Sequence, residues 1–197
     1  MPEAENKKGA EKLLETAKAR LKKCQEAEHE SRLLSLDDFR FYSGKQWPED
    51  IKKARSSQGS LAVCMTVNRC KPAVKQITND QRQNRGAIKV SPVDSGADPE
   101  TAKVLQGVIR HIEYDSDADI AYDTAHDHQV IGGFGFMRVL TEYEGPRTFH
   151  QSIKIKRFRN AFSVFVDSSS VEPSGSDAKF AFVVSKLTKE EYKAEYP

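Results

Sequence analysis

The sequence predicts an α+β fold in which N-terminal helices precede a mostly antiparallel β-sheet. Three observations support this class. Before Gly132, apolar residues recur every three or four positions, which is the spacing of one helix face. After Gly132, apolar and polar residues alternate, as in a half-buried strand. The 197 residues are 38% hydrophobic and 30% charged, and this lean mixture indicates long exposed helices or surfaces that partners cover.

Composition and charge narrow the classes of function that the chain can serve. The formal net charge is only +2, so no overall electrostatic field indicates a nucleic-acid partner. We find no apolar leader after a charged segment and no apolar run of membrane-spanning length, so we expect a soluble protein without a membrane partner. The three cysteines include no CxxC pair, which favours small apolar thiols in a reducing compartment over a zinc site.

Residues 1–35 are expected to form an N-terminal helical arm. From about residue 9, apolar side chains recur at steps of three and four, and charged side chains cover the rest of the surface. The apolar stripe is narrow and fails at Glu28 and Ser31. Such a helix should pack by one seam on something else, such as a neighbouring copy. The stripe consists of Ala10, Leu14, Ala17, Leu21 and Cys24.

An aromatic region follows the arm. It includes Phe41, Tyr42 and Trp47, the last being the single tryptophan of the chain. We interpret these side chains as a hydrophobic anchor that holds the arm to the rest of the protein. A site for an aromatic ligand is the alternative interpretation.

The surroundings of the anchor predict little regular structure. Asp37 or Asp38 is expected to cap a short helical turn, which Ser43-Gly44 should end. The stretch 48–60 is charged and then small and polar, so it is expected to be a loop. A short apolar run occupies residues 61–67.

A helix is predicted over residues 68–86. It should start between Asn68, a good cap, and Pro72, which is tolerated only in a first turn. Gly86 should end it. The alternation after it predicts a strand over residues 87–91, stopped by proline.

Two more helices are predicted over residues 98–114 and 116–131. Asp98 can cap the first of them. Ser116 and Asp119 resemble a capping pair at the start of the second.

Charge is distributed unevenly over these helices. The stretch 69–89 has six basic residues against one acid, whereas residues 98–129 have eight acids against two bases. The acidic segment is a plausible partner for the basic one. A basic face rich in arginine and amides also suits a phosphate backbone or a polar subunit interface, and a solvated helix face remains the third interpretation.

A sheet is expected over residues 134–185. Strands 134–143 and 148–157 flank a hairpin turn, and strands 162–166 and 178–185 follow. In the second strand Phe149, Ile153 and Ile155 alternate with Lys154 and Lys156, so the apolar face should be buried and the basic face exposed.

The last predicted element is a helix over residues 188–197. Thr188 and Glu191 have the spacing of a capping box at its start. Because the sequence stops just inside this helix, we expect it to be a piece of a longer protein.

Asp123, His126, Asp127 and His128 contain metal-ligand side chains, but their spacing argues against a metal site. On a helix His126 and His128 point about 200° apart, so they cannot chelate one ion. His128 lies on the apolar stripe, which favours a core histidine. We therefore expect no metal.

The glycines Gly132, Gly133 and Gly135 resemble a phosphate loop in composition only. In phosphate loops the glycines precede a helix, whose N-terminus faces the phosphate, whereas here a helix comes first. We predict a structural turn that stops the helix and starts the strand. With no catalytic motif elsewhere, we expect neither an enzyme nor a cofactor.

Several ordered blocks resemble the P22-like portal proteins of podovirus-type tailed phages. The first is Phe41-Tyr42-Ser43-Gly44-Lys45-Gln46-Trp47, similar to a signature FYxGxQW. Further blocks lie at 66–69, 79–85, 88–94, 123–139, 165–168, 177–180, 188–191 and 196–197. Each block is weak alone, and the ordered set is specific.

This resemblance implies a structural subunit of a ring, dodecameric in that family, at one capsid vertex of the virion. Double-stranded viral DNA enters and leaves through the ring. The implied partners are the terminase motor, capsid and scaffolding proteins, and tail adaptor or head-completion proteins, with assembly in the host cytoplasm. Residues 36–197 would belong to the wing region of a larger, mainly helical subunit, whose stem and clip are expected downstream.

We predict that basic residues of two stretches include DNA or subunit contacts. The alternative function is a non-enzymatic nucleic-acid-binding module that uses the basic stretches 69–89 and 154–159. The predicted contact residues are Arg82, Arg85, Lys89, Lys154, Lys156, Arg157 and Arg159.

Overall fold

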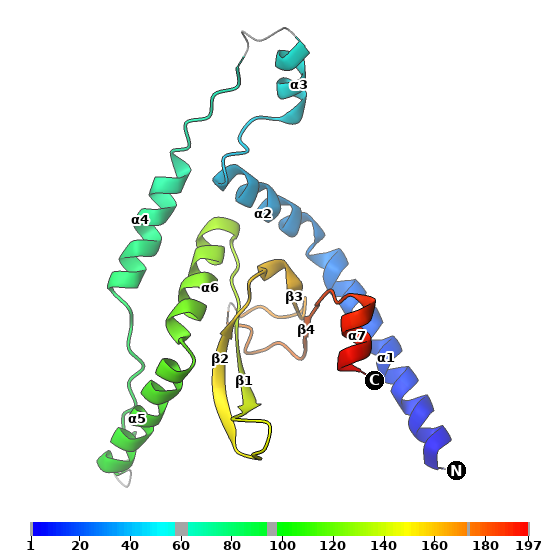
Figure 1. Cartoon of the computed structure of the whole chain (residues 1–197), viewed down its shortest axis with the longest axis vertical. Helices are drawn as coiled ribbons and strands as arrows, with labels where there is room; N and C mark the ends of the chain where they lie inside the picture. The colour runs from blue at the N-terminus through cyan, green and yellow to red at the C-terminus, as the bar shows by residue number, and fades with distance from the viewer. Residues whose placement is uncertain (1, 58–62, 94–97, 173, 197) are drawn as a thin grey trace. The chain divides into compact units, whose positions relative to one another are not determined.

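The computed structural model describes residues 2–57, 63–93, 98–172 and 174–196. These residues form an α+β fold, as the sequence predicts, with helices and two small antiparallel sheets (Figure 1). The chain divides into two compact units. Unit 1 combines Met1–Leu34 with Phe162–Pro197, and unit 2 is Ser35–Ala161.

Helical structure near the N-terminus extends further in both directions than the sequence predicts. Helix α1 spans Pro2–Ala27 and α2 spans His29–Tyr42. The expectation that Asp37 or Asp38 caps a short turn is wrong, because both residues lie inside α2. Backbone hydrogen bonds between residues four apart continue across Glu28, so the chain resumes its helix at once and needs no new cap.

Helix α3, Glu49–Ser57, replaces most of the loop expected over residues 48–60. Two acids in its first turn and Arg55 in its last turn favour a helix through the helix dipole, and Lys52 bonds Glu49 at 2.9 Å. Composition alone concealed this, since the helix has little apolar surface. The expectations for residues 58–62 and 94–97 lie outside the described residues.

Unit 2 contains three more helices, α4 (Cys70–Gln83), α5 (Pro99–Asp115) and α6 (Ala118–Gly132). Helix α4 lies beside α6 (Figure 1). Asp98 caps α5 by accepting from the backbone N–H groups of Glu100 and Thr101. Helix α4 ends at Gln83, before Gly86.

The capping pair predicted for α6 does not form. Asp117, in the left-handed conformation with φ 47°, precedes α6 and makes no side-chain cap. The backbone N–H of Ser116 instead donates to Ile112 at the end of α5, and the Asp119 carboxylate pairs with Arg85. The Asp119 carboxylate is therefore used by another partner, and the Ser116 hydroxyl has no hydrogen-bond partner among the described residues.

The strand expected over residues 87–91 is absent from the described structure, although this segment has no helix either. The side-chain amide of Gln106 on α5 takes the place of a neighbouring strand. It accepts from the Val90 N–H at 2.8 Å and donates to the Ile88 carbonyl. Strand-like alternation cannot produce a ladder when no strand partner lies beside it.

The four predicted strands form two separate sheets instead of one. Strands β1 (Met137–Tyr143) and β2 (Gln151–Arg157) pair as an antiparallel hairpin in unit 2. Strands β3 (Val164–Val166) and β4 (Ala181–Val183) pair in unit 1. A short 3-10 turn, Ala161–Ser163, follows the hairpin, and β3 pairs only with β4 among the described strands.

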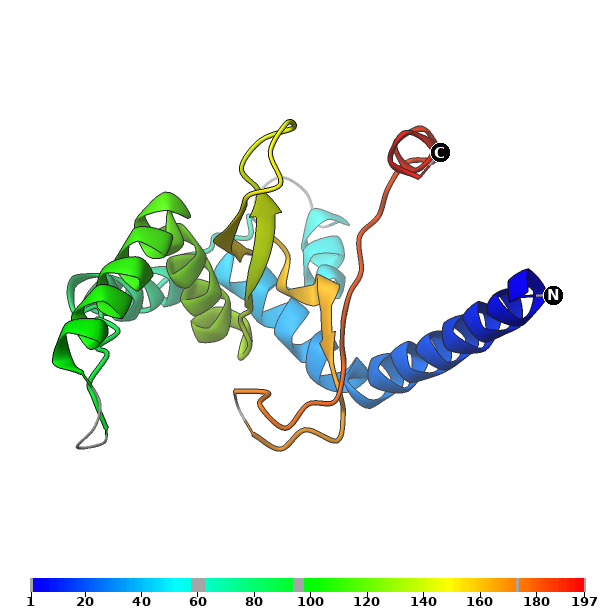
Figure 2. The same ribbon diagram turned by 90° about the horizontal axis from the view of Figure 1, so that it is seen from below.

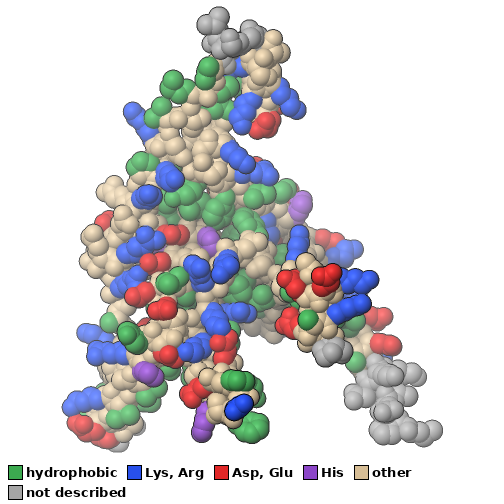
Figure 3. Space-filling view, in the orientation of Figure 1, with side chains coloured by type: hydrophobic (Ala, Val, Ile, Leu, Met, Phe, Trp, Pro, Cys, Tyr) green, Lys and Arg blue, Asp and Glu red, His purple; other side chains and the backbone are tan. Residues whose placement is uncertain are grey.

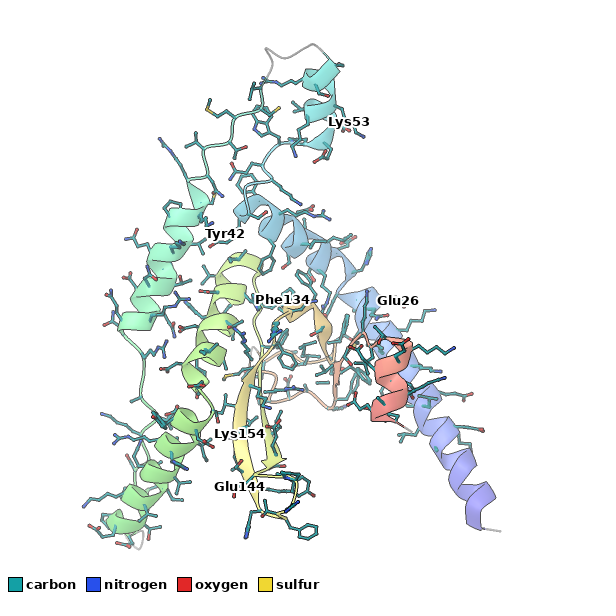
Figure 4. The ribbon with its side chains drawn as sticks, viewed as in Figure 1. Glu26, Tyr42, Lys53, Phe134, Glu144 and Lys154 are labelled. Carbon is teal, nitrogen blue, oxygen red and sulfur yellow. The ribbon has the colours of Figure 1, made fainter. Side chains whose placement is uncertain are left out.

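The hairpin covers the face that the sequence predicts to be exposed. Ile153 is 44% exposed and Phe149 is 95% exposed, whereas the Lys154 side chain is only 22% exposed. Lys154 extends from β2 in Figure 4, and its ammonium bonds the carboxylate of Asp115 at the end of α5. The predicted burial pattern is wrong at Ile153 and Lys154, because the ion pair with Asp115 of α5 draws Lys154 inward.

Unit 1 packs α1 against the small β3–β4 sheet. Cys24 of α1 is 1% exposed, and Arg20 lies over the Phe180 ring at 5.0 Å from its centroid. Helix α7, Lys189–Glu195, is the red helix beside the C-terminus in Figure 2. It begins at the capping box of Thr188 and Glu191, as predicted.

Candidate functional site

The glycine turn after α6 has three different geometric reasons for its three glycines. Gly133 ends α6 in the left-handed conformation with φ +86°, which strongly favours glycine. A Cβ at Gly132 would lie 2.4 Å from the Phe39 ring and 2.5 Å from the Ser35 hydroxyl oxygen. A Cβ at Gly135 would lie 1.8 Å from the Ala125 carbonyl oxygen. Conformation and close packing account for these glycines.

The same turn is tied to α2 by a buried hydrogen bond. The Ser35 hydroxyl donates to the Gly132 carbonyl at 2.7 Å, and Ser35 is 3% exposed. This bond satisfies one of the carbonyls that a helix end leaves without a partner. Its location at the C-terminal end of α6 gives the glycines no helix N-terminus to offer a phosphate.

Arg82 and Arg85 lie at the end of α4 and pair with aspartates of α6. Arg82 contacts Asp123 at 3.1 Å and Asp127 at 2.9 Å. Arg85 contacts Asp123 at 2.7 Å and also pairs with Asp119. The later arginine meets the earlier aspartates, so α4 and α6 run antiparallel. The basic and acidic segments are therefore partners within the chain, as their charges suggest.

Two cations of the hairpin are also neutralised inside unit 2. Lys154 bonds Asp115, and this hydrogen bond lowers the pKa of the Asp115 carboxyl below its ordinary value. Lys156 pairs with Glu142 on the neighbouring strand β1. Both lysines thus hold the hairpin in shape.

The other predicted contact residues differ from these four. Among the described residues, Lys89, Arg157 and Arg159 make no ion pair within 4.0 Å, and all three are exposed. Arg138, which the sequence analysis did not select, lies opposite Lys156 in the hairpin register and over the Phe158 ring. Figure 3 shows Lys and Arg side chains gathered over the hairpin on the face in view.

The aromatic motif builds the corner between α2 and α3. The Trp47 indole N–H donates to the Met65 carbonyl at 3.1 Å, and Arg55 of α3 lies 4.8 Å from the Trp47 ring centroid. Gly44 makes the corner with φ +102°. Phe41 is 46% exposed, and Tyr42 is half-buried at the end of α2 (Figure 4).

Asn68 completes this corner from the chain that leads into α4. Its side-chain amide donates to the Tyr42 carbonyl at 2.7 Å, while its oxygen accepts from Gln46 and from the Lys71 N–H. The contacts that the structure gives to the motif are thus structural and lie within unit 2.

The histidines and aspartates of α6 do not gather around a common point. The described residues contain no cluster of three or more possible metal ligands. Asp123 and Asp127 are occupied by Arg82, and His128 packs edge-on against Phe39 with 5.8 Å between ring centroids. Burial lowers the pKa of His128, which suits a neutral core histidine.

Sequence analysis missed Arg32, the central side chain of unit 1. Its guanidinium donates to Glu28 at 2.6 Å and to the carbonyls of Phe162 and Val164, and it lies 3.9 Å from the Phe165 ring centroid. The signal was present, because the apolar stripe of the arm fails at Glu28, four residues before Arg32.

None of the helices in the described part of the chain is long and apolar enough to cross a membrane.

More large apolar side chains are exposed than buried among the described residues. An exposed apolar surface of this extent, on an α+β chain whose Arg82, Arg85 and glycine turn support the fold, is typical of proteins that form part of a larger assembly. The family is shown by comparison: residues 18–197 match the model of the phage P22-like portal proteins, and the chain belongs to this family.

A curated relative agrees with the family match. The chain is 32% identical over 134 residues to the portal protein of Acyrthosiphon pisum secondary endosymbiont phage 1. The aligned region covers 66% of this chain and 19% of that relative. The chain therefore corresponds to a minor part of the length of the relative.

Proposed function

We propose that this chain is part of a structural portal subunit that forms a ring at one capsid vertex of the virion. Double-stranded viral DNA is packaged and ejected through this ring, which docks the terminase motor and the tail or head-completion proteins. The observation that carries the proposal is the family match over residues 18–197, which includes the C-terminal part of α1 and every later element.

Exposed apolar surface supports a role in assembly. Val104 of α5 is 65% exposed and Leu105 and Val108 are each 49% exposed. On the hairpin, Val139 and Tyr143 are 65% and 62% exposed. Patches of this kind mark surfaces that other proteins cover. We assign residues 1–35 to a helical arm and residues 36–197 to the wing region of the subunit.

The most direct test is the assembly state of the full-length protein. The proposal expects a large ring, dodecameric as in the family, in mass measurement and negative-stain images. Isolated subunits should have weak DNA affinity. A full-length protein that stays monomeric or dimeric at assembly concentrations contradicts the proposal.

The contact residues have a separate test. We propose that the predicted cations include inter-subunit or DNA contacts. Arg82 and Arg85 would act at a subunit contact indirectly, because they hold α4 against α6. Charge reversal of both arginines should impair ring assembly or DNA packaging. If both processes survive, the assignment of these two arginines fails, whereas the ring itself does not.

A second candidate is a non-enzymatic nucleic-acid-binding module. This function is favoured by Lys89, Arg157 and Arg159, which are exposed and make no ion pair within the described part of the chain, because such cations can neutralise phosphates. This candidate expects a monomer or dimer whose DNA affinity falls steeply with salt. The assembly measurement above separates the two functions.

A further inference from the structure

A groove of about 1100 Å³ in unit 2 lies among α4, α5 and α6 and reaches the start of β1. Ile88, Ile120 and Met137 of its lining are about half exposed, and Tyr114 is 86% exposed. The volume exceeds the roughly 300–1,000 Å³ of pockets for small ligands, so the groove can admit a turn of several residues. Its apolar lining favours an occupant that removes these side chains from water.

The charges of the groove restrict what this occupant can be. The lining carries three carboxylates and one guanidinium. The carboxylate of Asp119 pairs with Arg85, and that of Glu113 accepts from the Tyr122 hydroxyl at 3.1 Å. Asp117 is exposed and makes no ion pair among the described residues. A phosphate backbone would meet an excess of like charge here, whereas an apolar segment with a cation would match the groove.

The connection between β1 and β2, residues 144–150, has the properties of such a segment, and we call it the hairpin tip. Phe149 is 95% exposed. Arg147, two residues before it, is exposed and makes no ion pair within the described part of the chain. Glu144 marks the tip in Figure 4, at the far end of the hairpin strands. The hairpin tip thus presents an aromatic ring and a cation close together.

A chain cannot place its hairpin tip in its own groove. Met137, which lines the groove, is the first residue of β1, and Tyr143 is the last. Six steps along an antiparallel strand, at roughly 3.4 Å each, separate the groove from the tip by about 20 Å. The tip therefore needs the groove of a second copy. Because the two surfaces differ, the contact repeats from copy to copy and forms a ring if the rotation closes.

We propose that the hairpin tip of one copy inserts Phe149 into this groove of the next copy, with Arg147 beside Asp117. Glu144 adds a carboxylate to the same tip. Arg159, which lines an adjoining groove together with Asp117 and is exposed, can face it. The closure of this contact into a ring rests on the proposed function, but the contact itself does not.

The test is cysteine cross-linking of the full-length protein by a short bis-maleimide. Cys64, Cys70 and any exposed cysteine outside this chain are first replaced by Ser. The contact variant then carries Phe149→Cys and Ile120→Cys, and each of these substitutions is also made alone. The matched control carries Phe149→Cys and Val104→Cys, because Val104 of α5 is 65% exposed and lies outside the groove lining. Circular dichroism checks the folding of each variant.

We expect the contact variant to give a ladder of covalent dimers, trimers and higher species on a denaturing gel, because each copy offers its two cysteines to two different neighbours. The single variants and the matched control should give dimers at most.

A second measurement uses the native cysteines and no cross-linker. Phe149→Ser should raise the protein concentration needed for assembly about tenfold or more, because the ring is no longer buried in the groove. Val171→Ser is the control, since Val171 is 88% exposed in unit 1, and it should change this concentration by less than about threefold. Sedimentation measures the concentration for each variant.

The contact is overturned if wild-type rings form while the contact variant gives no ladder beyond that of its controls. Equal effects of Phe149→Ser and Val171→Ser on assembly also overturn it. A wild-type protein without rings contradicts the proposed function, and in that case a ladder from the contact variant still supports the contact. The absence of both the rings and the ladder overturns both proposals.

Discussion

Each of the two units contains an arginine centre, and the two centres use different chemistry. In unit 1, Arg32 is 13% exposed and bonds two backbone carbonyls, one carboxylate and an aromatic face. In unit 2, Arg82 and Arg85 are 39% and 29% exposed and bond only carboxylates in the contacts described above. Each centre joins segments that are distant in sequence, yet the Arg32 side chain is less exposed to water than those of Arg82 and Arg85.

Burial, more than the number of ion pairs, decides how much an arginine contributes to the stability of the fold. A half-exposed pair is screened by water and salt and contributes little. A buried guanidinium carries a large penalty if its partners are lost, since backbone carbonyls would remain unsatisfied beside it. Arg32 should therefore matter more than Arg82 and Arg85 together.

The largest expected effect is the loss of the Arg32 centre. Arg32→Met should lower the free energy of unfolding by about 3 kcal/mol, because it leaves Glu28 and two carbonyls without their donor. Urea unfolding followed by circular dichroism measures it. Arg20→Met, which removes only an exposed cation–π contact, is the control and should cost less than 1 kcal/mol. Equal costs would show that burial does not separate the two arginines.

The second-largest effect is expected from disrupting the glycine turn that ends α6. Gly133→Val should cost about 2 kcal/mol or more, because a β-branched residue is strained at φ +86°. The variant should fold or assemble less well, and no phosphate binding should be lost, because the turn is structural. Thermal unfolding measures the cost, and Gly9→Val in α1, where a Cβ meets nothing within 4 Å, is the control. A Gly133→Val chain as stable as Gly9→Val would contradict the turn assignment.

The third effect is expected from removing the ion pairs of Arg82 and Arg85 with α6. Replacing both Arg82 and Arg85 by Gln should cost about 1 kcal/mol at low salt, and the cost should shrink as salt screens the pairs. Urea midpoints at low and high salt measure it. Arg32→Met should show little such salt dependence. A cost for the double variant that is unchanged by salt would place its arginines in the buried class.

The smallest effect concerns pH near the C-terminal end of α6. Burial lowers the pKa of His128 below 6.5, with Asp127 acting weakly in the opposite direction. Above that pH both the folded and unfolded states hold a neutral ring. As the pH falls through about 6.5, the unfolded state takes up a proton more readily than the folded state, so stability declines.

His128→Gln should therefore flatten the dependence of the urea midpoint on pH between about 7.5 and 5.5. The aspartates whose pKa values are lowered titrate below this window and do not interfere. His150→Gln, at the exposed hairpin tip, is the control and should leave the slope unchanged. Identical slopes for wild type and His128→Gln would count against a buried neutral ring.

Local signals in the sequence predicted much of the helical structure. Asp98 and Thr188 cap α5 and α7 because a capping side chain bonds the backbone only two or three residues away. The glycine after α6 is similarly local. In contrast, α3 was missed because its stability comes from charge placement and not from an apolar stripe.

The candidate site was harder to predict, because pairing distinguishes cations that look alike in the sequence. Arg85 and Arg159 are both arginines in basic stretches, but only Arg85 meets carboxylates among the described residues. Arg138 lies opposite Lys156 only through the hairpin register, which depends on the turn. The apolar alternation of β2 likewise could not reveal that Asp115 would attract Lys154 and turn that face inward.

By itself, the sequence determined the α+β class, the capped helix starts, the glycine turn and the resemblance to the portal family, because each depends on neighbouring residues or ordered motifs. Only the tertiary structure decided which strands pair, which hairpin face is covered, and which arginines meet carboxylates. Those outcomes depend on groups such as Arg82 and Asp127, 45 residues apart, or Arg32 and Val164, 132 residues apart. Long-range charge pairing and burial therefore determine which charged and apolar side chains stay exposed for contact with partners.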